Sequence, residues 1–338
     1  MQEYSLPPQS GNSMEPDNRE DYERFRIKLS WKNGLRSQGG LLALTVIVNV
    51  LLLYVIQTAA SWVLSPLLWE FPQLTDLANE LFTFFLYILA FLLPYLAYAK
   101  LVHFSFREIP CDRPDPPVLA SCVGIALGVS VAGVLLSALV SLFFSLFGLY
   151  PMEFPTGLPS QPLVALLYLL NMTVLPAVVE ELVHRGIVLG SLRRYGDGFA
   201  IVISSILFAM LHRNMVQAPN ALLLGLLLGY FMVKTNSIFT SMTIHFVNNL
   251  IAVLLSIFVE NMGDMGAFLV QSALWMVYLA ACAAGLIYLL GVRRVQLELM
   301  RPGCPLDTAE LHGYFWSTLP AVVMVLLMIW VTFLNFTR

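Results

Sequence analysis

The chain has 338 residues, of which 58% are apolar and only 12% are charged, and its formal net charge is −3. A typical soluble domain carries about 25% charged residues, and the mean hydropathy of +0.77 is equally unsuited to a water-exposed surface. This composition excludes a soluble globular protein, and the lack of a basic patch interleaved with aromatic residues excludes a nucleic-acid-binding module. We therefore predict an all-α, polytopic membrane protein.

The first 38 residues differ from the rest in being polar and rich in Pro, Asn, Ser and charged side chains. We expect residues 1–38 to form a cytoplasmic, largely disordered tail, because such a composition buries too little apolar surface to fold. We expect no signal peptide, since the first apolar run begins only near Gly40. Basic residues directly before that run predict a topology anchor. Residues 39–338 then form the membrane domain.

Nine apolar runs follow the tail and predict the membrane-spanning helices. The fifth and sixth runs are shorter than the roughly 20 residues that a span needs. We expect eight to nine transmembrane helices, eight if the two short runs form a re-entrant pair and the last span shifts. In the fourth run, Asn171 and Pro176 predict a kink. The runs cover roughly residues 40–64, 79–102, 117–149, 161–192, 198–212, 219–233, 237–259, 268–292 and 314–336.

The distribution of basic residues predicts the orientation of these spans. With the N-terminus in the cytoplasm, every Lys and Arg except Arg185, Arg213 and Arg338 lies in or beside a cytoplasmic segment. Such a bias follows the positive-inside rule. We expect a multi-pass protein of the cell membrane with a cytoplasmic N-terminus and, for nine spans, a C-terminus outside.

The fourth apolar run contains three charged residues, Glu180, Glu181 and Arg185. One charged residue at the centre of a membrane helix costs roughly 2.5–3.5 kcal/mol, so three require an explanation. Glu181 and Arg185 are four residues apart and share a helix face, as do Glu180 and His184 on a face rotated by about 100°. This pattern indicates a buried acid–base group around which the other helices build a membrane chamber. The alternative is a structural ion-pair network.

Ionisable side chains of two later runs lie at a similar predicted depth. With a rise of about 1.5 Å per residue, Glu181, His212 and His245 lie roughly 16–21 Å from the cytoplasmic edge. Phe208 precedes His212 by four residues, and Asn249 follows His245 by four. Because groups this costly to bury face an interior cavity and find one another, we expect them to converge. Taken alone, His212 also fits a histidine at the membrane interface. His245 and Asn249 also fit an ordinary interhelical hydrogen bond.

Three motifs occur in order along these runs: E-E-x-x-x-R at residues 180–185, F-x-x-x-H at 208–212 and H-x-x-x-N at 245–249. Together they resemble the CPBP family of intramembrane proteases, which includes the CAAX prenyl endopeptidases and bacterial proteins linked to bacteriocin self-immunity. The resemblance covers about residues 160–255, which we take as the catalytic core. It implies an all-helical fold with a conical chamber open to the cytoplasmic leaflet.

The resemblance also implies a role for each motif residue. Glu180 would activate a water molecule, and His212 would help to position it and to transfer protons. His245 and Asn249 would stabilise the developing oxyanion, while Glu181 would support the geometry. Amide hydrolysis needs such a set of a base, an attacking water and donors for the oxyanion. Which glutamate is the base stays open. The supporting residues would be Arg185, Phe208, His184 and Asn248.

A zinc site is the alternative to this metal-free mechanism and would make the protein a metalloendopeptidase. Two histidines and a carboxylate are the ligands of many catalytic zinc sites, so the alternative zinc ligands are Glu180, His212 and His245. The H-E-x-x-H motif of many zinc proteases is absent, and the ligands would come from three separate helices. We therefore favour no metal and no other cofactor.

The sequence thus predicts an intramembrane endopeptidase that hydrolyses a membrane-embedded or lipid-anchored, CAAX-like peptide with a glutamate-activated water. Its partners would be that substrate and the lipid bilayer, without nucleic acid. One alternative is a non-catalytic membrane scaffold or bacteriocin-immunity protein of the same family. Another is a transporter with a Glu–His proton relay, which predicts inverted repeats that the sequence does not show.

Overall fold

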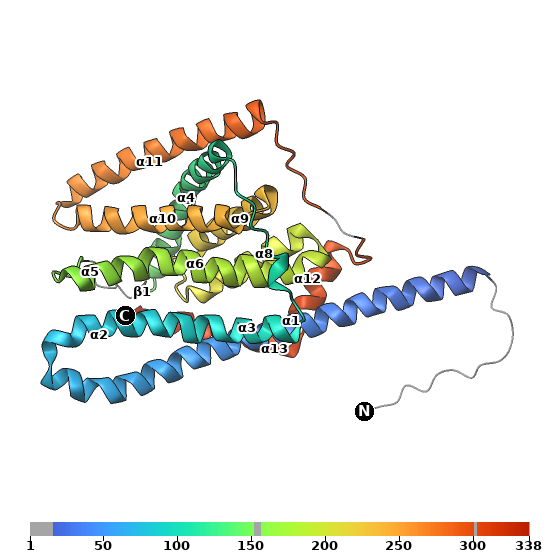
Figure 1. Cartoon of the computed structure of the whole chain (residues 1–338), viewed down its shortest axis with the longest axis horizontal. Coiled ribbons are helices and arrows are strands. Elements are labelled where there is room, and N and C mark those ends of the chain that lie inside the picture. The colour runs from blue at the N-terminus through green and yellow to red at the C-terminus, as the bar shows by residue number, and fades with distance from the viewer. Residues whose placement is uncertain (1–15, 152–156, 301–302, 338) are drawn as a thin grey trace.

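The structure is a computed structural model that describes residues 16–151, 157–300 and 303–337, and most of these residues are helical (Figure 1). The prediction of an all-α polytopic membrane protein is confirmed. The helices are α1 (Pro16–Glu70), α2 (Thr75–Leu86), α3 (Leu93–Leu101), α4 (Pro116–Ser145), α5 (Pro162–Leu169), α6 (Leu175–Glu181), α7 (Gly190–Leu192), α8 (Asp197–Leu211), α9 (Ala218–Thr235), α10 (Ile238–Val259), α11 (Asp264–Leu286), α12 (Thr308–Trp316) and α13 (Leu319–Leu334).

Shorter segments connect or continue these helices. Two-residue strands, β1 (Tyr150–Pro151) and β2 (Phe336–Thr337), pair antiparallel. Short 3₁₀ turns occupy Pro72–Leu74, Phe106–Glu108 and Arg193–Tyr195. π-Helical segments join α2 to α3, α5 to α6 and α6 to α7, and a fourth follows α11; they span Tyr87–Leu92, Leu170–Val174, Leu182–Leu189 and Ile287–Val292.

All nine predicted apolar runs lie on helices. Within the described residues, seven continuous helices are long and apolar enough to cross a membrane. The pair α12–α13 is an eighth candidate, although it is bent by 75°. The fifth predicted run is α8, an apolar helix of 15 residues. The structure therefore agrees with a protein of multiple spans in which one helix is shorter than a full crossing.

The first helix corrects one prediction. α1 has 55 residues and begins at Pro16, so the expectation of a largely disordered tail over residues 1–38 is wrong from that residue onward; the part before α1 lies outside the described residues. The polar half of α1 packs against the C-terminal region, where Lys28 forms a 2.6 Å ion pair with Glu310 of α12. Leu35 is fully buried in the core. Tertiary contacts thus order a segment whose composition alone favours disorder.

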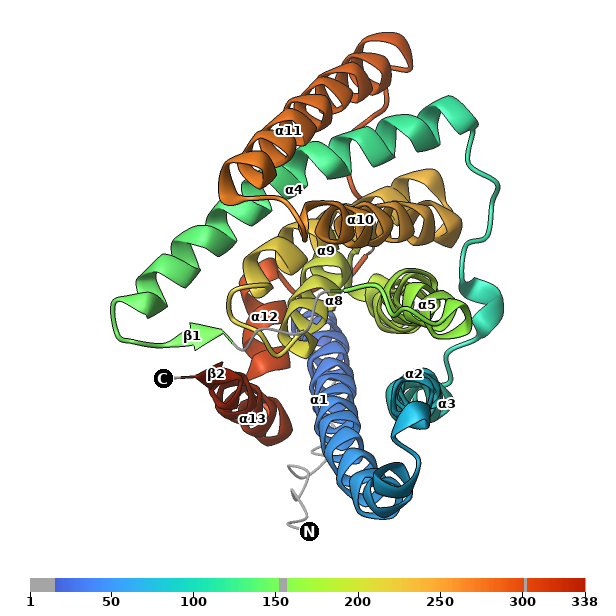
Figure 2. The same ribbon diagram turned by 90° about the vertical axis from the view of Figure 1, so that its left-hand side faces the viewer.

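Seen along the helices, the molecule has three groups of helices (Figure 2). α4 and α11 pack along each other at one edge, and α1 packs against α12 and α13 at another. Between them lie α6, α8, α9 and α10, which pack on one another, while α2 and α3 flank the α5–α7 helix. The central group carries all three sequence motifs.

The short β-pair joins the segment after α4 to the segment after α13. Tyr150, just after α4, pairs with Thr337, just after α13. Figure 1 shows this pair at one end of the molecule and the N-terminal end of α1 at the other. Which end faces the cytoplasm stays a prediction from the charge distribution.

Small residues let α4 and α11 approach each other closely. A Cβ atom added to Gly128 would lie 2.3 Å from Cβ of Cys282, and one added to Gly124 would lie 2.7 Å from the carbonyl oxygen of Ala281. Two glycines four residues apart are a common device where membrane helices pack. Backbone proximity, rather than side-chain interlocking, therefore determines this contact.

We expect Gly128→Ala to lower the thermal unfolding temperature of the detergent-purified protein. The added methyl group overpacks the contact with α11, which costs about 1–3 kcal/mol. Gly313→Ala is the control, because nothing lies within 4 Å of a Cβ added there. Equal unfolding temperatures for the two variants would contradict the close packing of α4 and α11.

Candidate active site

The two adjacent glutamates lie where a helix changes its geometry. Glu180 and Glu181 are the last residues of α6, which lies between two π-helical segments. Pro176 removes an α-helical hydrogen bond directly after the first of these segments. In that segment, Nδ2 of Asn171 donates to the backbone carbonyl of Glu80 at 2.9 Å and to its carboxylate at 2.7 Å. The predicted irregularity is thus a π-helical turn held by α2.

Glu181 is fully buried and makes two ionic contacts. Its Oε1 accepts a 3.1 Å hydrogen bond from Nη1 of Arg185 and lies 2.9 Å from Nδ1 of His245 on α10. Nη2 of Arg185 donates to the carbonyl of Gly225 on α9 at 3.1 Å. The guanidinium carbon lies 4.4 Å from the ring centroid of Phe208 on α8. The predicted ion pair is therefore present, and it joins α6 to three other helices.

Glu180 lies beside this network and is more accessible. Its side chain is 12% exposed, whereas that of Glu181 is not exposed at all. Oε1 of Glu180 accepts a hydrogen bond from the hydroxyl of Tyr87. Its Oε2 lies 3.9 Å from Nε2 of His245 and has no hydrogen-bond partner among the described residues. Of the two glutamates, Glu180 thus has the more exposed side chain, although its unpartnered oxygen is itself buried.

Phe208 is the common neighbour of three histidines. Its ring centroid lies 5.3 Å from that of His184, 4.8 Å from that of His212 and 5.7 Å from that of His245. The carbonyl of Phe208 also accepts a 2.8 Å hydrogen bond from Nδ1 of His212. Because a carbonyl only accepts, this nitrogen carries the proton, and Nε2 keeps its lone pair when the ring is neutral. In the described chain, no hydrogen bond or ion pair joins His212 to either glutamate.

His184 does not bond Glu180, although the two are four residues apart. Its ring is fully buried and lies among those of Phe91, Tyr95 and Phe208, at centroid distances of 6.0, 6.2 and 5.3 Å. Neither ring nitrogen has a hydrogen-bond partner in the described part of the chain. The ring is packed into this aromatic cluster rather than bonded to Glu180, so the spacing of four residues does not produce the expected contact. His184 is a packed core residue beside the site.

The two asparagines of α10 contact each other. Nδ2 of Asn248 donates to Oδ1 of Asn249 at 3.3 Å, and Oδ1 of Asn248 accepts from Ser130 on α4 at the same distance. Asn249 lies one turn after His245 on α10. Within the described ranges, Asn249 makes no hydrogen bond to His245 or to either glutamate. Asn248 therefore orients Asn249 and leaves the amide NH₂ of the latter free to donate.

The described residues contain no group of three or more His, Cys, Asp or Glu side chains arranged to hold a metal ion. Glu180 and His245 approach each other, but Nδ1 of His245 is used by Glu181, and His212 is oriented by a backbone carbonyl. These bonds are made at Nδ1 of each histidine and leave Nε2 of both rings available, so the preference for a metal-free mechanism stays a prediction.

Part of the chain matches a known family. Residues 161–251 match the family described as Rce1-like, type II CAAX prenyl endopeptidase Rce1-like. The chain contains an Rce1-like domain. The resemblance to the CPBP intramembrane proteases is thereby confirmed, and the Rce1-like domain, which includes all three motifs, supports a peptide hydrolase. No curated protein and no solved structure matches the chain.

Two residues that complete the site carry no motif signal. Tyr87 lies outside the Rce1-like domain, on the second span, where Tyr87, Phe91 and Tyr95 recur every four residues. That aromatic stripe is the signal that could have indicated a face turned toward the site. Gly225 lies inside the domain and leaves room for the guanidinium of Arg185, since a Cβ added there would lie 3.3 Å from Nη2.

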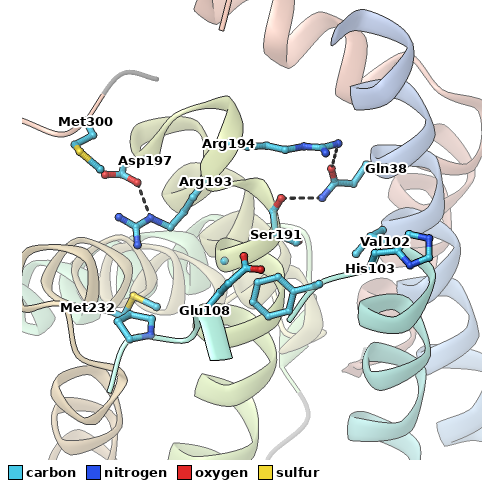
Figure 3. Close-up of a pocket in the computed structure, with 13 residues that line it drawn as sticks. Gln38, Val102, His103, Glu108, Ser191, Arg193, Arg194, Asp197, Met232 and Met300 are labelled. Atoms are coloured by element: carbon cyan, nitrogen blue, oxygen red, sulfur yellow. Dashed lines mark hydrogen bonds and ion pairs between the residues drawn. The ribbon is translucent and has the colours of Figure 1, made fainter. Parts of the chain in front are cut away.

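A polar cavity of about 560 Å³ lies beyond the C-terminal end of the helix that carries the glutamates (Figure 3). Nε of Arg193 donates to Asp197 at 2.8 Å, and Nη2 of Arg194 donates to Oε1 of Gln38 at 2.9 Å. Gln38 in turn donates to the carbonyl of Ser191 at 3.0 Å, which ties α1 to α7. The described residues that line this cavity include none from the three motifs. It therefore lies apart from the residues of the three motifs, although part of its lining belongs to the Rce1-like domain.

A second cavity, of about 650 Å³, borders the Rce1-like site. It is lined mostly by apolar side chains of α8, α9 and α13, among them Ala209, Met210, Leu222 and Met328. Ala209 and Met210 lie inside the F-x-x-x-H motif. An apolar space therefore adjoins the segment that presents the second motif. The predicted conical chamber and its cytoplasmic opening stay predictions.

Proposed function

We propose that the protein is an intramembrane endopeptidase that hydrolyses a peptide bond in a membrane-embedded or lipid-anchored, CAAX-like substrate through a glutamate-activated water. The observation that carries this proposal is the partly exposed Glu180, with one carboxylate oxygen bonded and the other unpartnered beside His245. The Rce1-like domain supports the reaction class. The substrate class and the mechanism are our proposals.

In this mechanism, Glu180 is the general base. Its unpartnered oxygen accepts a proton from a water molecule, whose oxygen then forms a bond to the carbonyl carbon of the substrate. The carbonyl π electrons move onto the substrate oxygen and give a tetrahedral oxyanion. A base positioned within hydrogen-bond reach of its proton typically contributes about 10²–10⁴-fold to a rate.

The remaining motif residues serve the oxyanion and the leaving group. The amide of Asn249 donates to the oxyanion, and His245 donates from Nε2 when its ring is protonated, a charge that the two flanking glutamates balance. The tetrahedral intermediate collapses as the carbon–nitrogen bond breaks. The leaving amine takes the proton that came from the water, directly from Glu180 or through the free nitrogen of His212.

The apolar surroundings support a membrane-borne substrate. The cavity of about 650 Å³ next to the F-x-x-x-H motif offers an apolar space to a hydrocarbon chain or an apolar side chain. We place the protein in the cell membrane with a cytoplasmic N-terminus, and we propose the bilayer and a membrane peptide or lipidated protein as its partners. A hydrolytic site between helices also requires that the substrate enter laterally or from one membrane face.

The test is cleavage of a panel of lipid-anchored and transmembrane peptides by protein purified in detergent. Wild type is compared with Glu180→Ala and His212→Ala, each with and without a strong zinc chelator. We expect wild type to cleave and to resist the chelator, because the proposed mechanism uses no metal. Cleavage should be lost in both variants, because Glu180 and His212 accept and transfer the proton of the water.

Two results would contradict the proposal. Cleavage that the chelator stops and added zinc restores would assign Glu180, His212 and His245 to a metal site. A folded wild-type protein that cleaves no peptide of the panel, together with a Glu180→Gln variant whose phenotype in cells matches wild type, would favour the non-catalytic scaffold or immunity protein.

A further inference from the structure

One contact of the site comes from outside the Rce1-like domain. Tyr87 opens the π-helical segment between α2 and α3, and its hydroxyl donates to Oε1 of Glu180. The tyrosine ring stacks on Phe91 with centroids 5.5 Å apart and an angle of 12° between the planes. Packing therefore fixes the ring, and the fixed ring directs its hydroxyl at the carboxylate.

The contact determines how Glu180 is held. A hydrogen bond to an ionised acceptor is about twice as strong as one between neutral groups. The two carboxylate oxygens are chemically equivalent, so either one can accept the bond from the phenol. What the bond fixes is the position and the plane of the carboxylate group. The second oxygen is then directed toward His245, 3.9 Å away.

We propose that Tyr87 is a positioning residue of the peptidase site, which anchors one oxygen of Glu180 so that the other receives the proton of the attacking water. This inference rests on the proposed function. It assigns part of the site to the second span, which no motif marks. We expect Tyr87 to affect the rate of the chemical step and not substrate binding, because it acts through Glu180 and its loss leaves the substrate-binding surface unchanged.

No other group in the described residues replaces this donor. Glu181 is an acceptor, and the guanidinium of Arg185 is used by Glu181 and the carbonyl of Gly225. His245 faces the opposite oxygen of the carboxylate. Among the described residues, the charged and titratable groups near the pair include Glu181 and Arg185 on the same span, His245 on α10 and Arg213 after α8.

The test compares Tyr87→Phe with Tyr95→Phe in the full-length protein. Both substitutions remove a buried hydroxyl from the second span and keep the ring, but the hydroxyl of Tyr95 has no hydrogen-bond partner among the described residues. We expect Tyr87→Phe to lower kcat about 10- to 100-fold, the effect of losing a hydrogen bond to a charged group. KM should change less than about twofold, as for an interaction made mainly in the transition state. Tyr95→Phe should leave both unchanged.

An infrared measurement tests the contact without any substrate. The carboxylate stretching band that Glu180→Gln removes should shift in Tyr87→Phe and stay in place in Tyr95→Phe. Tyr87 is not a positioning residue if this band is unmoved, or if an active wild type and Tyr87→Phe share the same kcat. If the proposed peptidase function is wrong, wild type cleaves no peptide. The infrared measurement needs no substrate and still decides whether Tyr87 positions Glu180.

Discussion

Glu180→Gln is expected to abolish peptide cleavage and to leave the protein folded. Glutamine keeps a carbonyl oxygen that accepts the hydrogen bond from Tyr87, but its amide takes no proton from water. Loss of a general base typically lowers a rate about 10²–10⁴-fold, so kcat should fall at least about 100-fold. The measurement is kcat and KM on a cleaved peptide, with thermal unfolding in the same detergent to show that the fold is intact.

Two comparisons sharpen this result. Glu298→Gln changes an exposed glutamate of the loop after α11 and should match wild type in rate and stability. Glu181→Gln removes the counter-charge of the buried Arg185, so its main effect should be on stability. The roles of the two glutamates would be reversed if Glu180→Gln were stable with a normal kcat and Glu181→Gln were folded but inactive. Glu181 would then be the general base.

Arg185→Met should strongly destabilise the folded protein. The substitution leaves Glu181 as a fully buried carboxylate without its guanidinium partner and removes the bond to the carbonyl of Gly225. Breaking a buried pair by removing one partner costs about 3–5 kcal/mol. We expect a marked fall in unfolding temperature and in the yield of folded protein, measured by thermal unfolding and size-exclusion chromatography in detergent.

The double variant Glu181→Gln/Arg185→Met should recover part of that loss, because it leaves no uncompensated charge. Arg19→Met is the matched control: Arg19 forms an i,i+4 pair with Glu23 at 3.8 Å, but both side chains are well exposed. It should leave stability unchanged, as exposed pairs are screened by solvent. An Arg185→Met protein as stable as this control would show that the buried pair does not hold α6 to its neighbours.

Much of the fold could be predicted from the sequence, because apolar runs long enough to cross a bilayer admit few structures other than helices. The ion pair between Glu181 and Arg185 followed from helical spacing, and the approach of His245 to both glutamates agrees with the expectation that buried polar groups converge. Phe208 was expected to be a supporting residue four positions before His212. In the structure, its backbone carbonyl accepts a hydrogen bond from the His212 ring.

The rest depended on features that periodicity does not contain. The ring of His184 packs into the aromatic core instead of bonding Glu180, and helical spacing does not show which of the two contacts forms. The contact of Tyr87 with Glu180 was not predicted because the aromatic stripe that contains Tyr87 lies outside the three motifs and fits ordinary helix packing equally well. The helix over residues 16–38 was missed because its order comes from packing against a segment almost 300 residues later, shown by the ion pair of Lys28 with Glu310.

The position of the buried charges along the chain has a consequence for biosynthesis. Glu181 and Arg185 stand one turn apart on one helix, so they can neutralise each other as that helix leaves the ribosome and enters the bilayer. Tyr87, the donor to Glu180, belongs to a span made earlier, whereas His245 belongs to one made later. A nascent chain that stops before α10 can thus balance its ion pair without a complete site. Hydrolytic capacity would arise only late in translation, after the charged helix is already accommodated in lipid.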